Sequence, residues 1–267
     1  MISIVGILNC TPDSFSDGDP EISPARLYDY GLKLIDDGAD MIDIGGDSTR
    51  PGSICVDTDE EWRRIGSIVE RLALRIPISV DTHKGEIARR AIDCGARVIN
   101  DVGAGCDPEM RAVIAASDVS YVFMYSSSGV PHIFSKRLQD LVDVDVINKW
   151  IKARAESLQR DGIESSRLIA DTGMGAFLGP DPALSEGVVS KYEKVWAPAG
   201  GLMFGCSRKG FLKRQGERNL LERDALSCMY GLVVAGKIGP GVPLYLRVHN
   251  VALQRAASPT SFITLTR

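Results

Sequence analysis

Short apolar runs alternate with amphipathic segments along the whole chain. Eight runs have the continuous apolar character of strands that are buried on both faces and paired in parallel, over residues 2–8, 41–46, 77–81, 97–101, 119–124, 167–171, 202–206 and 243–248. Helical periodicity follows them, over residues 24–37, 57–74, 84–94 and 108–116, near 138–161 and 182–195, and in a long region that ends near Gly236. Eight strand–helix units in about 250 residues predict a (β/α)8 barrel, with residues 1–267 forming a single domain. An open doubly wound sheet shows the same alternation and is the alternative.

The balance of charge limits the classes of ligand. The chain has 31 Lys and Arg residues against 35 Asp and Glu residues, a net charge of −4. This argues against nucleic acid as the main partner, because neutralising phosphates needs an excess of clustered cations. An anionic ligand must therefore be bound by local cations, since the field of the whole protein does not attract it.

Cysteine usage and hydropathy predict a cytoplasmic location. Six cysteines are scattered without a C-x-x-C pair, so neither a disulfide scaffold nor a metal site of the usual cysteine spacing is expected. No run of about eighteen apolar residues occurs, which predicts that the chain has no transmembrane helix and no membrane partner. The apolar residues 1–8 lack a basic segment before them, so they are not interpreted as a signal peptide.

Polar residues gather at one end of the predicted strands. In a barrel the carboxyl ends of all strands meet on one face, where the following loops build the site. Any one of these residues alone is better explained as a helix cap or a turn residue, and Asp101, before Val102 and Gly103, is an example. Their recurrence on nearly every strand instead predicts a functional face, formed by Asn9, Asp43, Asp81, Asn100, Asp101, Asp171, Ser207, Arg247 and His249.

Four loops on that face carry candidate chemistry. Residues 9–18 form a long polar loop of a kind that closes over substrates. Residues 43–52 combine glycines with a hydroxyl and a guanidinium that suit an anion. Residues 207–211 place adjacent cations at the predicted start of a helix. Residues 171–175 offer a carboxylate to the N–H edge of a planar heterocycle. Together the loops predict a cavity with an anion end (Thr49, Arg247 and His249) and a heterocycle end (Asp81, Asn100, Asp171 and Lys209).

Six stretches of the sequence resemble the dihydropteroate synthase family, in the family's order and over nearly the full chain. They are GILNCTPDSFSDGD (6–19), GADMIDIGGDSTRPGS (38–53), ISVDTHKGEIARRAIDCGARVIND (78–101), GMGAFLG (173–179), SRKGFL (207–212) and LRVHNV (246–251). The resemblance implies a (β/α)8 barrel enzyme that joins p-aminobenzoate to a pterin methyl pyrophosphate, releases pyrophosphate and uses Mg2+ as its cofactor.

The resemblance also implies roles for particular residues. The pterin ring would be held by Asp81, Asn100, Asp171 and Lys209, the pyrophosphate by Thr49, Arg247 and His249, and the Mg2+ by Asn9. The p-aminobenzoate pocket would include Phe15, Pro51 and Gly210, and catalytic roles would fall to Phe15, Asp17, Arg208 and Lys209. Because the electron-rich pterin stabilises a cationic methylene carbon, the arylamine needs mainly positioning, and we predict no nucleophilic side chain.

Several positions depart from the family's pattern. Thr172 stands where the family usually has Pro, Tyr125 where it has His, and Gly210 where it has a Ser close to the p-aminobenzoate carboxylate. The last helix is interrupted by Ser258 and Pro259 after little more than two turns, so the homodimer that the family usually forms stays an open possibility. Two alternatives follow: a pterin-binding paralogue with weak or lost condensation activity, and a pterin-dependent methyltransferase.

Overall fold

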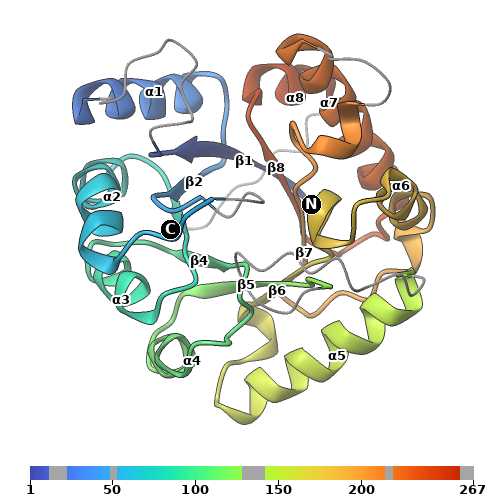
Figure 1. Ribbon diagram of the computed structural model, residues 1–267, viewed down its shortest axis with the longest axis horizontal. Helices are drawn as coiled ribbons and strands as arrows, with labels where there is room; N and C mark the ends of the chain where they lie inside the picture. The colour runs from blue at the N-terminus through green and yellow to red at the C-terminus, as the bar shows by residue number, and fades with distance from the viewer. Residues whose placement is uncertain (12–22, 49–52, 128–141, 214–218, 259–267) are drawn as a thin grey trace.

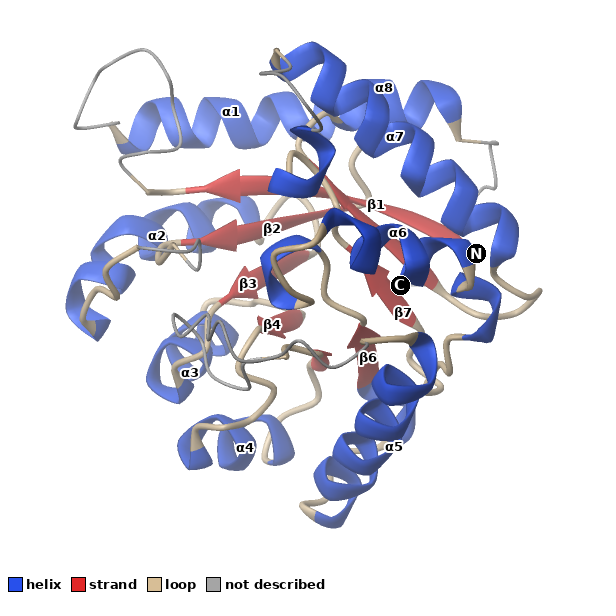
Figure 2. Ribbon diagram, turned by 45° about the vertical axis from the view of Figure 1, so that its right-hand side comes forward, coloured by secondary structure: helices blue, strands red, loops and turns tan. Residues whose placement is uncertain are grey.

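Eight parallel strands close into a barrel in the computed structural model (Figures 1 and 2). Each strand pairs with its neighbours in sequence, and β1 pairs with β8, which confirms the (β/α)8 barrel and excludes the open sheet. The structure describes residues 1–11, 23–48, 53–127, 142–213 and 219–258. The strands are β1 (Ile2–Asn9), β2 (Met41–Gly45), β3 (Ile78–Asp81), β4 (Val98–Asp101), β5 (Ser120–Met124), β6 (Leu168–Asp171), β7 (Leu202–Phe204) and β8 (Leu244–Val248).

Eight α-helices surround the barrel in the described ranges. They are α1 (Pro24–Asp36), α2 (Thr58–Leu72), α3 (Gly85–Asp93), α4 (Pro108–Ala115), α5 (Val144–Arg160), α6 (Pro182–Ser190), α7 (Leu220–Lys237) and α8 (Val251–Ala257). Short 3-10 helices add η2 (Ser165–Arg167), η3 (Gly175–Phe177), η4 (Tyr192–Lys194) and η5 (Gly210–Lys213). No helix in these ranges has the length and apolar character that crossing a membrane requires.

Local sequence explains where most helices begin. Seven α-helices start after a side chain that accepts a hydrogen bond from a backbone N–H of the first turn, which satisfies a donor that the helix itself cannot. Three of them, α1, α4 and α6, also place a proline in the first turn, where no N–H partner is lost. The capping residues are Ser23, Asp57, Asp107, Asp143, Asp181, Asn219 and Asn250.

Two predicted helices are too long because local caps and core contacts override the helical periodicity, and one predicted strand extends too far. Residues 142 and 143 lie outside α5, since Asp143 has an extended backbone and caps the helix that starts at Val144. The helix predicted near 182–195 ends at Ser190, and the 3-10 turn that follows buries Tyr192 edge-on against Phe204. The strand predicted to reach residue 206 ends at Phe204.

The segment after β7 also differs from its prediction. The cations at 208 and 209 precede only the four-residue 3-10 helix η5, and the long helix α7 begins at Leu220 under the cap of Asn219. The short last helix is confirmed, because α8 ends at Ala257 and the backbone of Ser258 is extended.

The core has two parts. Most buried apolar side chains lie between the strands and the surrounding helices. A smaller cluster draws one residue from each of seven strands, and we place it inside the barrel because side chains alternate across a strand. It consists of Val5, Met41, Val98, Val122, Ile169 and Met203, with Tyr245 packed against them.

Candidate active site

A polar layer lies directly above the apolar cluster inside the barrel. Residues two positions further along each strand point to the same side and lie closer to the carboxyl end. Counting two residues on from members of the apolar cluster therefore reaches Asp43 on β2, Asn100 on β4, Asp171 on β6, Gly205 after β7 and Arg247 on β8. The strand ends thus bring the predicted polar residues to one face of the barrel.

Arg247 is held between two carboxylates in this layer. Its Nε donates to Asp43 Oδ2 at 2.6 Å, and one of its terminal nitrogens donates to Asp81 Oδ2 at 2.7 Å. Asp43 is fully buried and also accepts from Ser79 Oγ at 2.5 Å and from Asn100 Nδ2 at 3.1 Å. Asp81, Asn100 and Arg247 are therefore members of one hydrogen-bonded network centred on Asp43.

The charges in this network shift the acidity of its members. Burial raises the pKa of Asp81, with the Arg247 guanidinium opposing the rise and the neighbouring Asp43 carboxylate adding to it. Burial also works against the charged form of Arg247, but Asp43 and Asp81 outweigh it and hold the pKa of Arg247 above its ordinary value. The guanidinium consequently stays charged, and burial disfavours the charged form of the Asp81 carboxylate beside it.

Asp171 and Lys209 form a second part of the site. Asp171 is buried, and its Oδ1 accepts the N–H of Gly173 at 2.7 Å, a turn that needs the positive φ of 66° found at that glycine. Burial raises the pKa of Asp171, and the positive charge of Lys209 opposes that rise most strongly. A carboxylate held in this way keeps acceptor capacity for the N–H groups of a bound heterocycle.

Lys209 lies in an unusual environment for a lysine. Its Nζ donates to the carbonyl of Met174 at 3.2 Å and lies 4.6 Å from the ring centroid of Phe177, a cation–π contact. Burial lowers the pKa of Lys209 to about 8, although Asp171 favours the charged form. A partly buried ammonium interacts more strongly than an exposed one with an anion or electron-rich ring placed beside it.

His249 and Arg208 are each fixed by a neighbour. His249 Nδ1 lies 2.9 Å from Ser207 Oγ, and the His249 backbone N–H donates to the same oxygen at 3.1 Å. Arg208 has a left-handed φ of 56°, and its guanidinium makes two hydrogen bonds, of 2.6 and 2.8 Å, to Asp224 on α7. A non-glycine residue in this conformation is uncommon and occurs mainly where a site requires it.

The structure brings six of the predicted site residues to one face, and four others lie outside the residues that it describes. Asp81, Asn100, Asp171, Lys209, Arg247 and His249 all lie at the carboxyl ends of strands or in the loops directly after them. Arg247, predicted for the anion end, donates a hydrogen bond to Asp81, predicted for the heterocycle end, so the two ends adjoin each other. The predictions for Phe15, Asp17, Thr49 and Pro51 lie outside the described residues.

Two predictions concern residues at the edge of this face. Gly210 is exposed, begins η5, and has no heavy atom within 4 Å of the position that a Cβ would take. Asp101 is a turn residue, as its sequence context suggested. Its carboxylate accepts hydrogen bonds from the N–H groups of Gly103 and Gly105 and from the Tyr121 hydroxyl.

Two acidic residues of this face were given no specific role by the sequence. Asp43 was visible in the sequence only as one more polar residue at a strand end, and its central position depends on contacts with residues 36 to 204 positions away. Asp224 lies inside a helix, where nothing in the local sequence indicates that it fixes Arg208.

Asn9 is the candidate magnesium ligand. It ends β1 opposite Gly45 of β2, and no hydrogen bond to its side chain occurs within the described ranges. Its amide oxygen is a hard donor of the kind that Mg2+ prefers, and Mg2+ commonly takes one or two protein ligands and completes its shell with water and substrate phosphates. The amide oxygen of Asn9 is therefore a suitable ligand for Mg2+.

Comparisons with known proteins agree with this arrangement. Residues 5–249 match the family described as pterin binding enzyme. The dihydropteroate synthase of Bacillus subtilis is 37% identical over 216 residues, which cover 79% of this chain and 72% of the relative. That of Staphylococcus haemolyticus is 34% identical over 257 residues, covering 94% and 90%. The Xanthomonas albilineans dihydropteroate synthase structure with 4-aminobenzoic acid has a TM-score of 0.82 at 33% identity, covering 96% of this chain and 90% of that one. The same protein in complex with 7,8-dihydropteroate has a TM-score of 0.79 at 32% identity, with the same coverage.

Proposed function

The chain belongs to the pterin binding enzyme family and, within it, to the dihydropteroate synthases, and from this premise we propose how its own residues carry out the reaction. The enzyme condenses 6-hydroxymethyl-7,8-dihydropterin pyrophosphate with p-aminobenzoate to give 7,8-dihydropteroate and pyrophosphate. The observation that carries the proposed mechanism is the polar layer inside the barrel, in which one guanidinium, one ammonium and three carboxylates meet at the strand ends.

The heterocycle is bound by the buried half of this layer. Asp171 accepts the N–H groups of the pterin edge, and Lys209 donates to a ring acceptor beside it. Asn100 already gives an N–H to Asp43, so its amide orientation is fixed and its oxygen is left to accept from the ligand. Asp81 faces the ring from β3. A flat ring bound here displaces water from the site and strengthens these charged contacts.

The pyrophosphate is bound at the rim of the layer. His249 reaches it from the loop after β8, where the Ser207 hydroxyl lies 2.9 Å from Nδ1 and orients the ring. Arg247 adds its positive charge from within the network, and Thr49 adds a hydroxyl. Asn9 would hold Mg2+, which when bound supplies positive charge that stabilises the leaving pyrophosphate.

The arylamine attacks the methylene carbon of the bound pterin as the bond to pyrophosphate breaks. The amine needs to be positioned more than deprotonated, because the pterin spreads the developing positive charge. No enzyme nucleophile is required, and the buried thiols fit this view, since burial raises the pKa of both Cys10 and Cys206 to about 12 and keeps them protonated. Phe15, Pro51 and Gly210 line the arylamine pocket in this proposal, with Asp17 and Arg208 beside the reacting groups.

A two-substrate assay tests the proposal. Pure protein with pterin pyrophosphate, p-aminobenzoate and Mg2+ should form dihydropteroate and release one pyrophosphate for each product. Asp171→Asn keeps the acceptor for Gly173 but loses the charge, and it should weaken pterin binding by about 2–5 kcal/mol. Asp181→Asn, at the exposed cap of α6, is the matched control. Unchanged pterin affinity in Asp171→Asn would remove this residue from the pterin site.

The same assay separates the synthase from the alternatives. Thr172, Tyr125 and Gly210 motivate a paralogue that binds pterin without condensing it, and such a protein would bind pterin pyrophosphate in calorimetry and form no product. The relatives reported above are dihydropteroate synthases, which favours the synthase over a pterin-dependent methyltransferase.

We also propose a cytoplasmic enzyme that forms a homodimer. The exposed apolar side chains of α7, which include Leu221, Met229 and Val233, offer a surface for a second copy of the chain. Light scattering of the pure protein tests the dimer, and a mass equal to one chain at micromolar concentration would reject it.

A further inference from the structure

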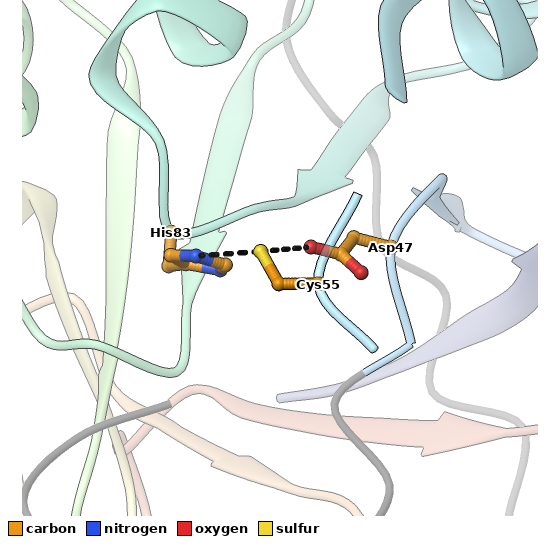
Figure 3. A group of neighbouring side chains, drawn as sticks. All are labelled: Asp47, Cys55 and His83. Carbon is orange, nitrogen blue, oxygen red and sulfur yellow. Dashed lines mark hydrogen bonds between the residues drawn. The ribbon is translucent and has the colours of Figure 1, made fainter. Parts of the chain in front are cut away.

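Three side chains with different donor atoms meet at the edge of the barrel face (Figure 3). Asp47 follows β2, Cys55 lies further along the same connection before α2, and His83 follows β3. Cys55 Sγ lies 3.2 Å from Asp47 Oδ2 and 4.0 Å from His83 Nε2. The three donor atoms all lie within 4.8 Å of one another. Figure 3 shows the Cys55 thiol between the imidazole of His83 and the carboxylate of Asp47, in a row that the dashed lines connect.

The two distances from the Cys55 thiol are close to those that a tetrahedral metal imposes. Zinc binds sulfur at about 2.3 Å and nitrogen or oxygen at about 2.0–2.2 Å, so its ligand atoms lie roughly 3.3–3.6 Å apart. Shifts of a few tenths of an ångström would bring the thiol to these separations from both partners. Cys55 is exposed and His83 is partly exposed, so a cation reaches the cluster from solvent without opening the fold.

We propose that Asp47, Cys55 and His83 form a binding site for a borderline-soft divalent cation of the zinc type, with the fourth position open to water. Thiolate, imidazole and carboxylate together are a donor set that zinc accepts and Mg2+ does not, since Mg2+ takes oxygen ligands. The site is therefore distinct from the magnesium ligand proposed at Asn9, and it does not depend on the condensation reaction.

Two charged neighbours set the electrostatics of this site. Lys84 Nζ lies 3.1 Å from Asp47 Oδ2 and also donates to Glu61 Oε2 and to the carbonyl of Val56, both at 2.6 Å. A cation bound to Asp47 therefore competes with one of the three contacts of Lys84, which keeps the other two. Glu61 is fully buried, so the ammonium remains where it is and lowers the affinity of the site without closing it.

Binding is a proton exchange and involves no oxidation. The S–H bond of Cys55 breaks, its proton passes to solvent, and the sulfur forms a bond to the metal with both electrons. Metal affinity should consequently fall as the pH is lowered.

Cobalt titration of the full chain tests the proposal, because Co2+ bound to a thiolate absorbs visible light. We expect one Co2+ per chain, with a sulfur-to-metal charge-transfer band that Zn2+ abolishes and that excess Mg2+ leaves in place. Cys55→Ser should lose the band, and His83→Phe should lower the affinity at least tenfold. Cys106→Ser, at the other exposed thiol, is the matched control and should bind as the parent chain does.

Three results of the cobalt titration would overturn the proposal. A band that survives Cys55→Ser, or that disappears with Cys106→Ser, would show that another thiol binds the metal and would overturn the proposal. Absence of any band at millimolar Co2+ would do the same. Far-ultraviolet circular dichroism identifies variants that fail to fold. A Zn2+-dependent rise in melting temperature, expected in the parent chain and in Cys106→Ser but absent in Cys55→Ser, gives a second measurement of the site.

Discussion

Lys209→Met should remove a pH dependence from the stability of the fold. The ammonium of Lys209 is forced into the barrel face, where burial lowers its pKa from the ordinary 10.5 to about 8. Each pKa unit corresponds to about 1.4 kcal/mol, so the protonated side chain opposes folding by up to about 3 kcal/mol. The side chain keeps some contact with water, which makes this figure an upper value.

The direction of the effect follows from proton binding. Between pH 8 and 10.5 the unfolded chain still carries the proton that the native chain has lost, and raising the pH therefore favours the native state. Below pH 8 both states are protonated, so the full cost is present and constant. Relative to Lys209→Met, the parent chain should thus gain up to about 3 kcal/mol of unfolding free energy between pH 8 and pH 10.5.

Urea unfolding at a series of pH values measures this difference. Other groups titrate over the same range, so the quantity to compare is the free energy of the parent minus that of the variant at each pH. Lys191→Met, at an exposed position after α6, controls for the loss of a positive charge. A parent-minus-variant difference that stays flat from pH 7 to pH 10 would refute the idea that Lys209 is forced into a site that disfavours its charge.

Three further predictions concern other parts of the face. Arg247→Met leaves the buried carboxylate of Asp43 and the partly exposed carboxylate of Asp81 without their cation and should lower the unfolding free energy by about 3–5 kcal/mol. A loss below about 1 kcal/mol would show that the ion pairs do not support the fold. Lys84→Met leaves the buried carboxylate of Glu61 without its cation and should lower the unfolding free energy, measured with urea, by a similar amount. Combining it with Glu61→Leu should recover most of that loss. Strictly additive losses in the double variant would contradict this coupling. Gly210→Ser fits without a clash and adds a hydroxyl where the family has one. It should leave the melting temperature unchanged and lower the KM for p-aminobenzoate about fivefold. An unchanged KM would place this residue outside the arylamine pocket.

The order of strands and helices could be predicted because each element carries its own signal. Strands that are buried on both faces appear as continuous apolar runs, and glycines with positive φ stop helices where the sequence suggests, as Gly38 does after α1 and Gly95 after α3. The cap at Asp57 and the start of α4 after Asp107 are likewise local features. Closure of the barrel is shown by the pairing of β1 with β8, because an open doubly wound sheet has the same alternation of elements.

Boundaries that depend on the rest of the fold could not be predicted in this way. The periodicity of residues 182–195 suits one helix, but burying Tyr192 against Phe204 requires the chain to leave the helix after Ser190. In the same way, the cluster of Asp47, Cys55 and His83 has no motif spacing, because its members come from two different connections and meet only when β2 and β3 pair.

The charge of the assembled face explains why the sequence indicated the ligand class better than the role of each residue. The resemblance assigns Arg247 to the pyrophosphate, whereas the structure gives it two carboxylate partners, on β2 and β3, far away in sequence. Counting Asp43, Asp81 and Asp171 against Arg247 and Lys209 leaves the layer with three acidic and two basic groups. A layer of this composition does not attract a polyanion by itself. We therefore propose that pyrophosphate binding needs more than Arg247, and draws also on groups at the rim of the face and on a cation that arrives with the substrate, while the interior of the barrel recognises the neutral, N–H-rich ring.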